Sequence, residues 1–184
     1  MEQETASIKL STPLTDQQIS SLRAGAWVTL SGVVYAARDQ AHRRLAALLE
    51  KGQPLPFDVQ GAVIYYVGPT PPPPGRVIGS AGPTTAGRMD AFTPLLLKAG
   101  LKGTIGKGCR SRQVQEALVQ YRAVHFSAMG GFGALLSRHI VDSRPIAYED
   151  LGPEAVRRLV FRDFPAIVAY DCYGSSIYEQ RSKG

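Results

Sequence analysis

The stretch GPTTAGRMD at residues 82–90 marks a change of local structure in the chain. Its Gly-Pro start favours a tight turn, and its two threonines follow where a helix is expected to begin. Free backbone N–H groups at such a start favour anions. Arg88 comes four residues after Thr84, so the two side chains can face one volume. The stretch predicts a turn into a helix with a candidate anion site, although a capped helix with a surface arginine would look the same.

On both sides of this stretch, segments typical of strands alternate with segments typical of helices. Residues 27–35 (WVTLSGVVY) and 62–67 (AVIYYV) are rich in β-branched and aromatic residues. Between them, a helix is expected to start with Asp39 as its N-cap and to end at Lys51. Further strands are expected at 76–79, 103–106, 123–128, 139–148 and 164–170, and further helices at 15–22, 91–98, 111–120, 129–136 and from Gly152. Such a mixture predicts an α/β fold.

The chain of 184 residues suits a single domain, expected to span 1–184 with residues 1–10 as an extended tail. Pro71 to Pro74 form a stiff polyproline loop, which could be an internal hinge but is too short to separate two domains. The hydrophobic fraction of 44% is enough for a core. No apolar run approaches membrane-spanning length, and the acidic N-terminus does not resemble a secretory signal. The expected location is therefore cytoplasmic.

The net charge of +6 favours anionic partners. Nucleic-acid binding would need a basic cluster with interleaved aromatic residues. The basic pairs Arg43-Arg44 and Arg157-Arg158 instead fall in segments expected to be helices, where solvated faces are the simpler interpretation. No nucleic acid is therefore expected as a partner.

The two cysteines, Cys109 and Cys172, are far apart in the sequence. They cannot supply the three or four thiolates that an iron–sulfur cluster usually needs. The three histidines show no metal-ligand spacing, so no metal site is expected in this chain. Cys109 is interpreted as a small buried residue that fills space.

Two further cations fall where α/β proteins build their sites. Arg38 follows an expected strand, and Lys107 lies between two glycines after another. The surroundings of Lys107 lack the glycine spacing and the hydroxyl residue of a P-loop. Together with Arg88, these residues would provide three fixed positive charges, which suits a substrate with two carboxylates.

Four ordered blocks resemble the β component of class I fumarases and of L-tartrate dehydratase. GPTTAGRMD at 82–90 is similar to the family signature, and SGVVYAARDQAH at 31–42 is similar to its ARD…AH segment. IGKG at 105–108 resembles the lysine loop of the family. The stretch at 147–171 resembles its C-terminal DFPAIV region.

This resemblance implies a swivelling β/β/α domain and a separate α subunit, in a heterodimer or an α2β2 assembly. The α subunit would carry a four-iron, four-sulfur cluster with one iron open to substrate. Arg38, Arg88 and Lys107 would bind the substrate, and Thr84 would be the base that removes the C3 proton of malate. The implied reaction is the reversible hydration of fumarate to L-malate.

Two alternatives remain at this point. L-Tartrate dehydratase uses a four-carbon diacid too, so the same cations would serve it. A module that binds small anions or regulates a partner without catalysis would also use them. Assay of the chain with an α-type partner distinguishes the alternatives.

Overall fold

A computed structural model of the chain describes residues 7–179. Its strands are β1 (Ile8–Ser11), β2 (Trp27–Ala36), β3 (Val63–Tyr65), β4 (Gly103–Gly106), β5 (Val124–Ser127), β6 (Ile140–Ala147) and β7 (Val156–Tyr170). Its helices are α1 (Asp16–Ser21), α2 (Asp39–Glu50), α3 (Thr93–Ala99), α4 (Arg112–Gln120) and α5 (Gly133–Leu136). Short 3-10 helices are η1 (Ala86–Met89), η2 (Ser137–His139) and η3 (Glu149–Glu154). None of these helices is long and apolar enough to cross a membrane.

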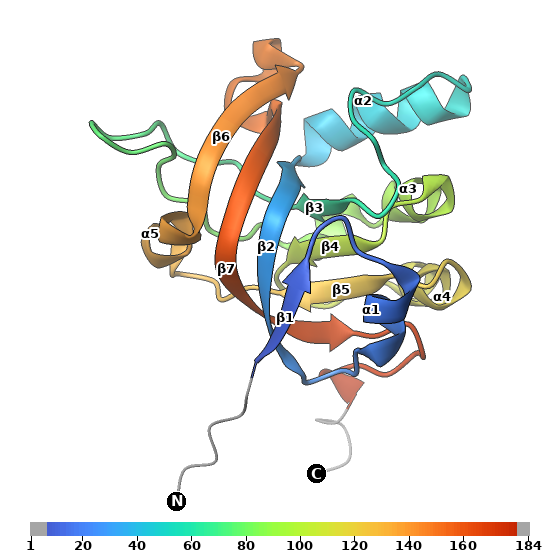
Figure 1. The fold of residues 1–184 in the computed structure, drawn as a ribbon. Helices are drawn as coiled ribbons and strands as arrows, with labels where there is room; N and C mark the ends of the chain where they lie inside the picture. Colours follow the sequence, from blue (N-terminus) through green and yellow to red (C-terminus); the bar gives the residue numbers. More distant parts are fainter. Residues whose placement is uncertain (1–6, 180–184) are drawn as a thin grey trace, which may run out of the picture.

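Five strands close into a mixed barrel (Figure 1). Neighbouring strands in the series β2-β3-β4-β5 are parallel. β7 then pairs antiparallel with both β5 and β2, which closes the ring. β1 extends the sheet beside β2, and β6 extends it beside β7. This architecture confirms the predicted α/β class and the swivelling β/β/α type of fold.

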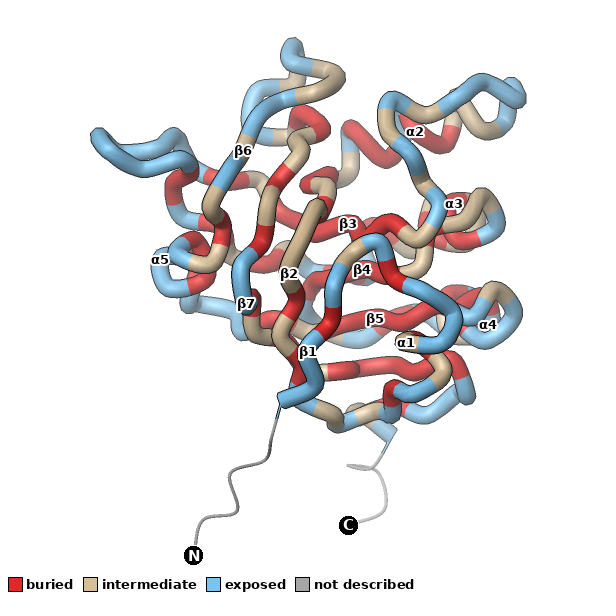
Figure 2. Tube along the Cα trace, in the orientation of Figure 1, coloured by how far each residue is buried: buried red, intermediate tan, exposed pale blue. Residues whose placement is uncertain are grey.

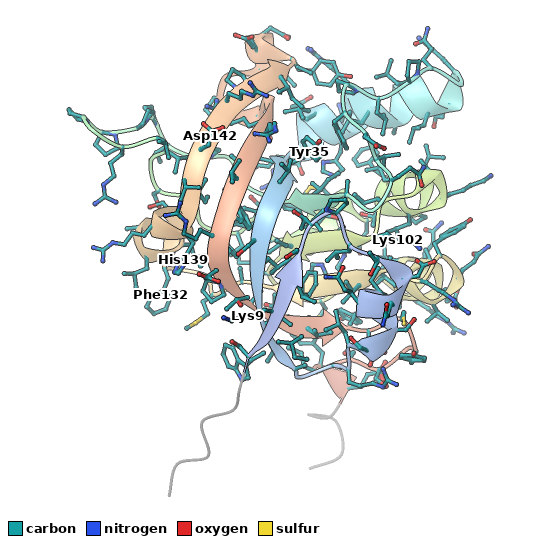
Figure 3. All side chains as sticks on the ribbon, viewed as in Figure 1. Lys9, Tyr35, Lys102, Phe132, His139 and Asp142 are labelled. Carbon is teal, nitrogen blue, oxygen red and sulfur yellow. The ribbon has the colours of Figure 1, made fainter. Side chains whose placement is uncertain are left out.

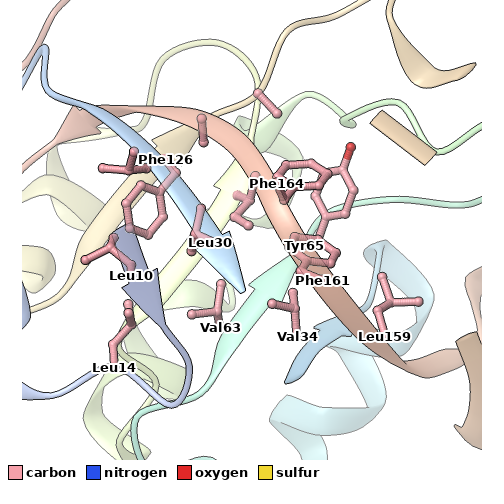
Figure 4. Close-up of a cluster of buried hydrophobic side chains, with 14 of the residues drawn as sticks. Leu10, Leu14, Leu30, Val34, Val63, Tyr65, Phe126, Leu159, Phe161 and Phe164 are labelled. Carbon is pink, nitrogen blue, oxygen red and sulfur yellow. The ribbon is translucent and has the colours of Figure 1, made fainter. Parts of the chain in front are cut away.

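The buried side chains form two clusters, one on each side of the barrel wall. Inside the barrel, Leu30, Tyr65 and Phe164 belong to a core whose aromatic rings meet at its centre (Figure 4). Outside it, α2, α3 and α4 cover one side, and the strands beneath them are buried (Figure 2). Ile64 and Tyr66 belong to that outer cluster. The apolar run at 62–67 is continuous because β3 is buried on both faces.

Most of the predicted elements occur, and their ends follow local chemistry. Thr15 caps α1 in a capping box with Gln18, as a Thr-x-x-Gln start favours. Ser111 caps α4 by accepting a hydrogen bond from Val114 N. The predicted helix at the 82–90 stretch is shorter than expected: η1 is a single 3-10 turn, and α3 starts at Thr93.

The helix predicted from Gly152 is wrong. Gly152 has φ of 58°, η3 ends at Glu154, and the chain then runs as the fifteen-residue strand β7. Arg157 and Arg158 therefore lie in a strand and not in a helix. β7 pairs with β2, β5 and β6 in turn, and this long-range pairing outweighs the helical spacing of its apolar residues.

One smaller prediction also fails. Residues 76–79 are not a strand but part of the loop that contains the prolines: Arg76 and Val77 are exposed, whereas Ile78 and Gly79 are buried, with Gly79 close to Thr70. Of the predicted tail at 1–10, residues 8–10 lie in β1 with Leu10 buried, and residues 1–6 lie outside the described part.

Candidate active site

The predicted site residues lie at one edge of the barrel. Since β2, β3, β4 and β5 are parallel, their carboxyl ends meet at the same edge. Arg38 follows β2 by two residues, and Lys107 directly follows β4. The segment that carries Thr84 and Arg88 is hydrogen-bonded to the residues just after β3 and just after β4. We call this edge, with Arg38, Thr84, Arg88 and Lys107, the cationic edge.

Thr84 and Lys107 are joined through their backbones. Thr84 N donates to Tyr66 O at 2.7 Å, just beyond β3, and Lys107 N donates to Thr84 O at 3.1 Å. Ala86 N donates to Lys107 O at 2.8 Å, so the two segments form a short parallel bridge. Both the amide and the carbonyl of Thr84 are thus used, which fixes where its side chain begins. The predicted proximity of Thr84 and Lys107 is observed.

Arg38 and Arg88 are connected through Asp39. Asp39 was expected to be the N-cap of α2, but Arg38 occupies that position and Asp39 is the first helical residue. An Asp39 Oδ2 atom accepts a hydrogen bond from Arg88 Nη2, and Glu154 Oε1 lies 3.5 Å from Arg38 Nε. A positive charge near the N-terminus of a helix is electrostatically unfavourable, and Arg38 lies at the N-terminus of α2. The carboxylates of Asp39 and Glu154 offset this unfavourable interaction.

Gly68 and Gly130 lack side chains where the side chains of Arg38 and Lys107 pass close to the backbone. A Cβ on Gly68 would come within 2.6 Å of Arg38 Nη1, and a Cβ on Gly130 would lie 3.4 Å from Lys107 Cδ. Arg38 therefore packs on the loop after β3, and Lys107 reaches the loop after β5. The cations differ in accessibility: Lys107 is exposed, whereas 51% of the Arg88 side chain and 25% of the Arg38 side chain are exposed.

A buried arginine beneath this edge was missed by sequence analysis. The Arg110 side chain is fully buried, and its Nε donates to Asp90 Oδ1 at 2.7 Å. The other Asp90 oxygen accepts from Ser111 N at 2.6 Å. Since Asp90 ends the 82–90 stretch and Arg110 follows the lysine loop, the ion pair locks the two site segments together. Further partners of the guanidinium are Tyr66, Thr93, Thr104 and His125.

The charges in this network follow from its burial. Burial opposes the positive form, but Tyr66 and Asp90 outweigh it and raise the pKa of Arg110. Burial and the nearby Arg110 lower the pKa of His125 well below its ordinary value, so its ring is neutral. Because Arg110 Nη1 can only donate, His125 Nδ1 accepts and the ring proton lies on Nε2.

His42 holds the turn that carries Arg38. Burial lowers the pKa of His42 to about 4, so the ring is neutral at pH 7. Its Nδ1 lies 2.8 Å from Arg38 O, and a carbonyl can only accept, so Nδ1 carries the proton. His42, like His125, is a fully buried residue with a structural role.

The cysteines do not form a metal site with their neighbours. Within residues 7–179, no group of three or more His, Cys, Asp or Glu side chains is placed to hold a metal ion. Cys172 is buried, with Sγ 3.9 Å from Ile19 O. Cys109 is exposed, so its prediction as a buried residue is wrong: the loop after Lys107 turns it outward beside Gly87. These residues do not fit an iron–sulfur cluster bound by this chain.

A closed mixed barrel with helices on its outer face, and with a row of cations where four parallel strands end, defines a swivelling β/β/α domain. A family model described as Fumarase C-terminus matches residues 1–181. The chain therefore belongs to the Fumarase C-terminus family, which confirms the resemblance seen in its sequence blocks.

Individual relatives agree with this assignment. Fumarate hydratase 2 of Leishmania major is 37% identical over 166 residues, covering 89% of this chain and 29% of the relative. The anaerobic class I fumarate hydratase of Escherichia coli K12 is 34% identical, covering 97% of this chain and 33% of the relative. The putative L(+)-tartrate dehydratase subunit beta of Methanocaldococcus jannaschii is 35% identical, covering 92% and 90%. The chain thus spans about a third of the fumarate hydratases but nearly all of the β subunit.

Proposed function

We propose that this chain is the β subunit of an iron–sulfur-dependent hydro-lyase that interconverts fumarate and L-malate. The observation that carries the proposal is the pattern of coverage: the chain corresponds to a whole β subunit but to a third of each fumarate hydratase. The remaining part, with the four-iron, four-sulfur cluster, would then be a separate α subunit. This division agrees with a chain whose described residues do not fit a cluster.

The cationic edge would bind the substrate. Arg38 and Arg88 each present a guanidinium, which matches a carboxylate with two parallel hydrogen bonds. Lys107 adds a compact charge from the neighbouring strand end. Removing the proton next to a carboxylate builds extra negative charge on that carboxylate. Fixed cations stabilise this charge where it develops, which lowers the barrier.

Thr84 would move the proton. Its backbone is held on both sides, by Tyr66 and by Lys107, which fixes the point from which its side chain extends. A threonine hydroxyl is a weak base unless a cation stabilises its ionised form. Lys107, whose backbone is bonded to that of Thr84, is the candidate for this cation within the chain. The docked partner would exclude water and strengthen this interaction.

A tartrate dehydratase is the second candidate, because the relative of matching length bears that name.

Both candidates are tested by anaerobic co-expression of this chain with the α-type chain of the same organism. Fumarate, malate and both tartrates are then assayed in parallel. We expect hydration of fumarate by the assembled pair and none by either chain alone. Robust turnover by the isolated chain would contradict the proposal, and activity on tartrate alone would favour the second candidate.

Replacing Thr84 with alanine is expected to lower kcat of the assembled enzyme by roughly 10²–10⁴ with a smaller change in KM. Loss of a group that transfers a proton affects the transition state more than substrate binding. Thr84→Ser should recover much of kcat, since it restores the hydroxyl. Steady-state kinetics measure the separate effects of each substitution on kcat and on KM. Thr85→Ala, at the exposed neighbouring residue, is the matched control. If Thr84→Ala raised KM and left kcat unchanged, Thr84 would bind the substrate without transferring the proton.

A further inference from the structure

An apolar groove lies beside the cationic edge. It has a volume of about 480 Å³ and is formed by the start of β2, the end of β5, α5 and the middle of β7. Its lining is mostly apolar and includes Trp27, Met129, Phe132 and Leu135, with Arg138 and His139 among its few polar members. We call it the α5 groove. Phe132 and His139 are both labelled near α5 in Figure 3.

The groove collects exposed hydrophobic side chains. Eight large hydrophobic residues are exposed within residues 7–179, and four of them line this groove. Trp27, Met129, Phe132 and Leu135 expose 45%, 56%, 44% and 49% of their surface. Single exposed hydrophobic residues are ordinary, but several around one hollow mark a site of interaction.

The groove shares a border with the cationic edge. Met129 lines the groove, and the next residue, Gly130, lies under the Lys107 side chain. Gly133, the first residue of α5, accepts a hydrogen bond from Ala81 N at 3.1 Å. A Cβ on Gly133 would come within 2.8 Å of Gly82 N, at the start of the 82–90 stretch. A protein that covers the cationic edge on this side must therefore meet the groove.

We infer that the α5 groove is the docking surface for the cluster-bearing α subunit, which inserts an apolar segment flanked by acidic residues. This inference rests on the proposed function. About two thirds of each of these fumarate hydratases lies outside the part that this chain matches, so a body roughly twice the size of this domain is available to pack against it. Acidic flanks would meet Arg138 at the groove and the cations beside it.

A second copy of this chain fits the groove less well. A symmetric dimer would bring two cationic edges together, and each chain already has a net charge of +6. It would also cover the edge that the substrate must reach. Charge and access therefore favour a different, more acidic chain as the occupant.

The test replaces Phe132 and Leu135 with serine in one variant. Val119→Ser is the matched control, since Val119 is 42% exposed on α4, away from the groove. Binding to the purified α-type chain of the same organism is measured by calorimetry, and circular dichroism checks the fold. We expect binding roughly 10–100-fold weaker for the double variant and unchanged for the control. Hydratase activity of the double variant should return at saturating α chain.

Several results would overturn the inference. The double variant could bind the α chain as tightly as the wild type does, or the wild-type chain could fail to bind the α chain. The wild-type chain could also form a dimer with itself that the double variant does not form. The proposed function is judged separately, by turnover of the wild-type pair. If the pair binds through the groove but hydrates no substrate, the docking surface stands and the proposed reaction fails.

Discussion

Arg88→Ala in the assembled enzyme is expected to reduce kcat/KM by roughly 150- to 5,000-fold, about 3–5 kcal/mol of transition-state stabilisation. The loss would be large because the guanidinium would face the substrate carboxylate in a site closed by the partner. The variant would also leave Asp39 without the arginine that it contacts. An unbalanced carboxylate there would repel a dianionic substrate, so KM should rise as kcat falls.

Two further variants make this result specific. Arg88→Lys keeps the charge but loses the planar fork, and it should recover only part of the activity. Arg44 on α2 forms a more exposed pair with Asp150, at 2.9 and 2.6 Å, and is not one of the four residues of the cationic edge. Arg44→Ala should leave kcat/KM nearly unchanged. Near-normal activity of Arg88→Ala in a correctly assembled enzyme would remove Arg88 from the site.

Arg110→Met is expected to destabilise the isolated chain by about 3–5 kcal/mol, because it leaves the carboxylate of Asp90 without its ionic partner. The side chain of Asp90 is only 14% exposed, so water cannot fully replace the guanidinium. Tyr66 and Thr93 also lose a donor. Urea unfolding followed by circular dichroism measures the free energy of unfolding.

A double variant separates the ion pair from simple packing. Asp90→Asn combined with Arg110→Met should be less destabilised than the sum of the single variants, since the unpaired charge is gone. Arg112→Met is the control: Arg112 pairs with Glu116, its side chain is 91% exposed, and its loss should barely move the unfolding midpoint. Strict additivity of the two single changes would show that Asp90 and Arg110 act independently.

The sequence predicts those parts of the fold that depend on local chemistry. Thr15 and Ser111 are recognisable caps, and the apolar run in β3 reflects burial on both faces. β7 could not be predicted in the same way, because Val156 and Leu159 have a spacing that suits a helix. Their strand conformation comes from strand partners instead: Leu159 pairs with Val34, more than a hundred residues away in β2, and Val156 pairs with Ala147 in β6.

In the candidate site too, some features could be predicted from local sequence, whereas others depend on contacts between distant residues. The order of strands and helices already indicated that Arg38, Thr84, Arg88 and Lys107 could meet at strand ends. The residues that hold them in place were not visible, because the contact between Asp39 and Arg88 spans 49 residues. Arg110 carried one signal, its position directly after the lysine loop and Cys109, but nothing local distinguishes a buried arginine from a solvated one.

The two strands that extend the barrel have a consequence for behaviour at high concentration. Every strand of the closed ring has a neighbour on both sides, so within residues 7–179 the outer sides of β1 and β6 are the sheet's open borders. β1 is four residues long and carries Lys9, while β6 carries exposed Arg144 and Pro145. Short length, charge and a residue without an N–H all discourage further strands from adding. These features oppose aggregation by the addition of strands at the two open borders.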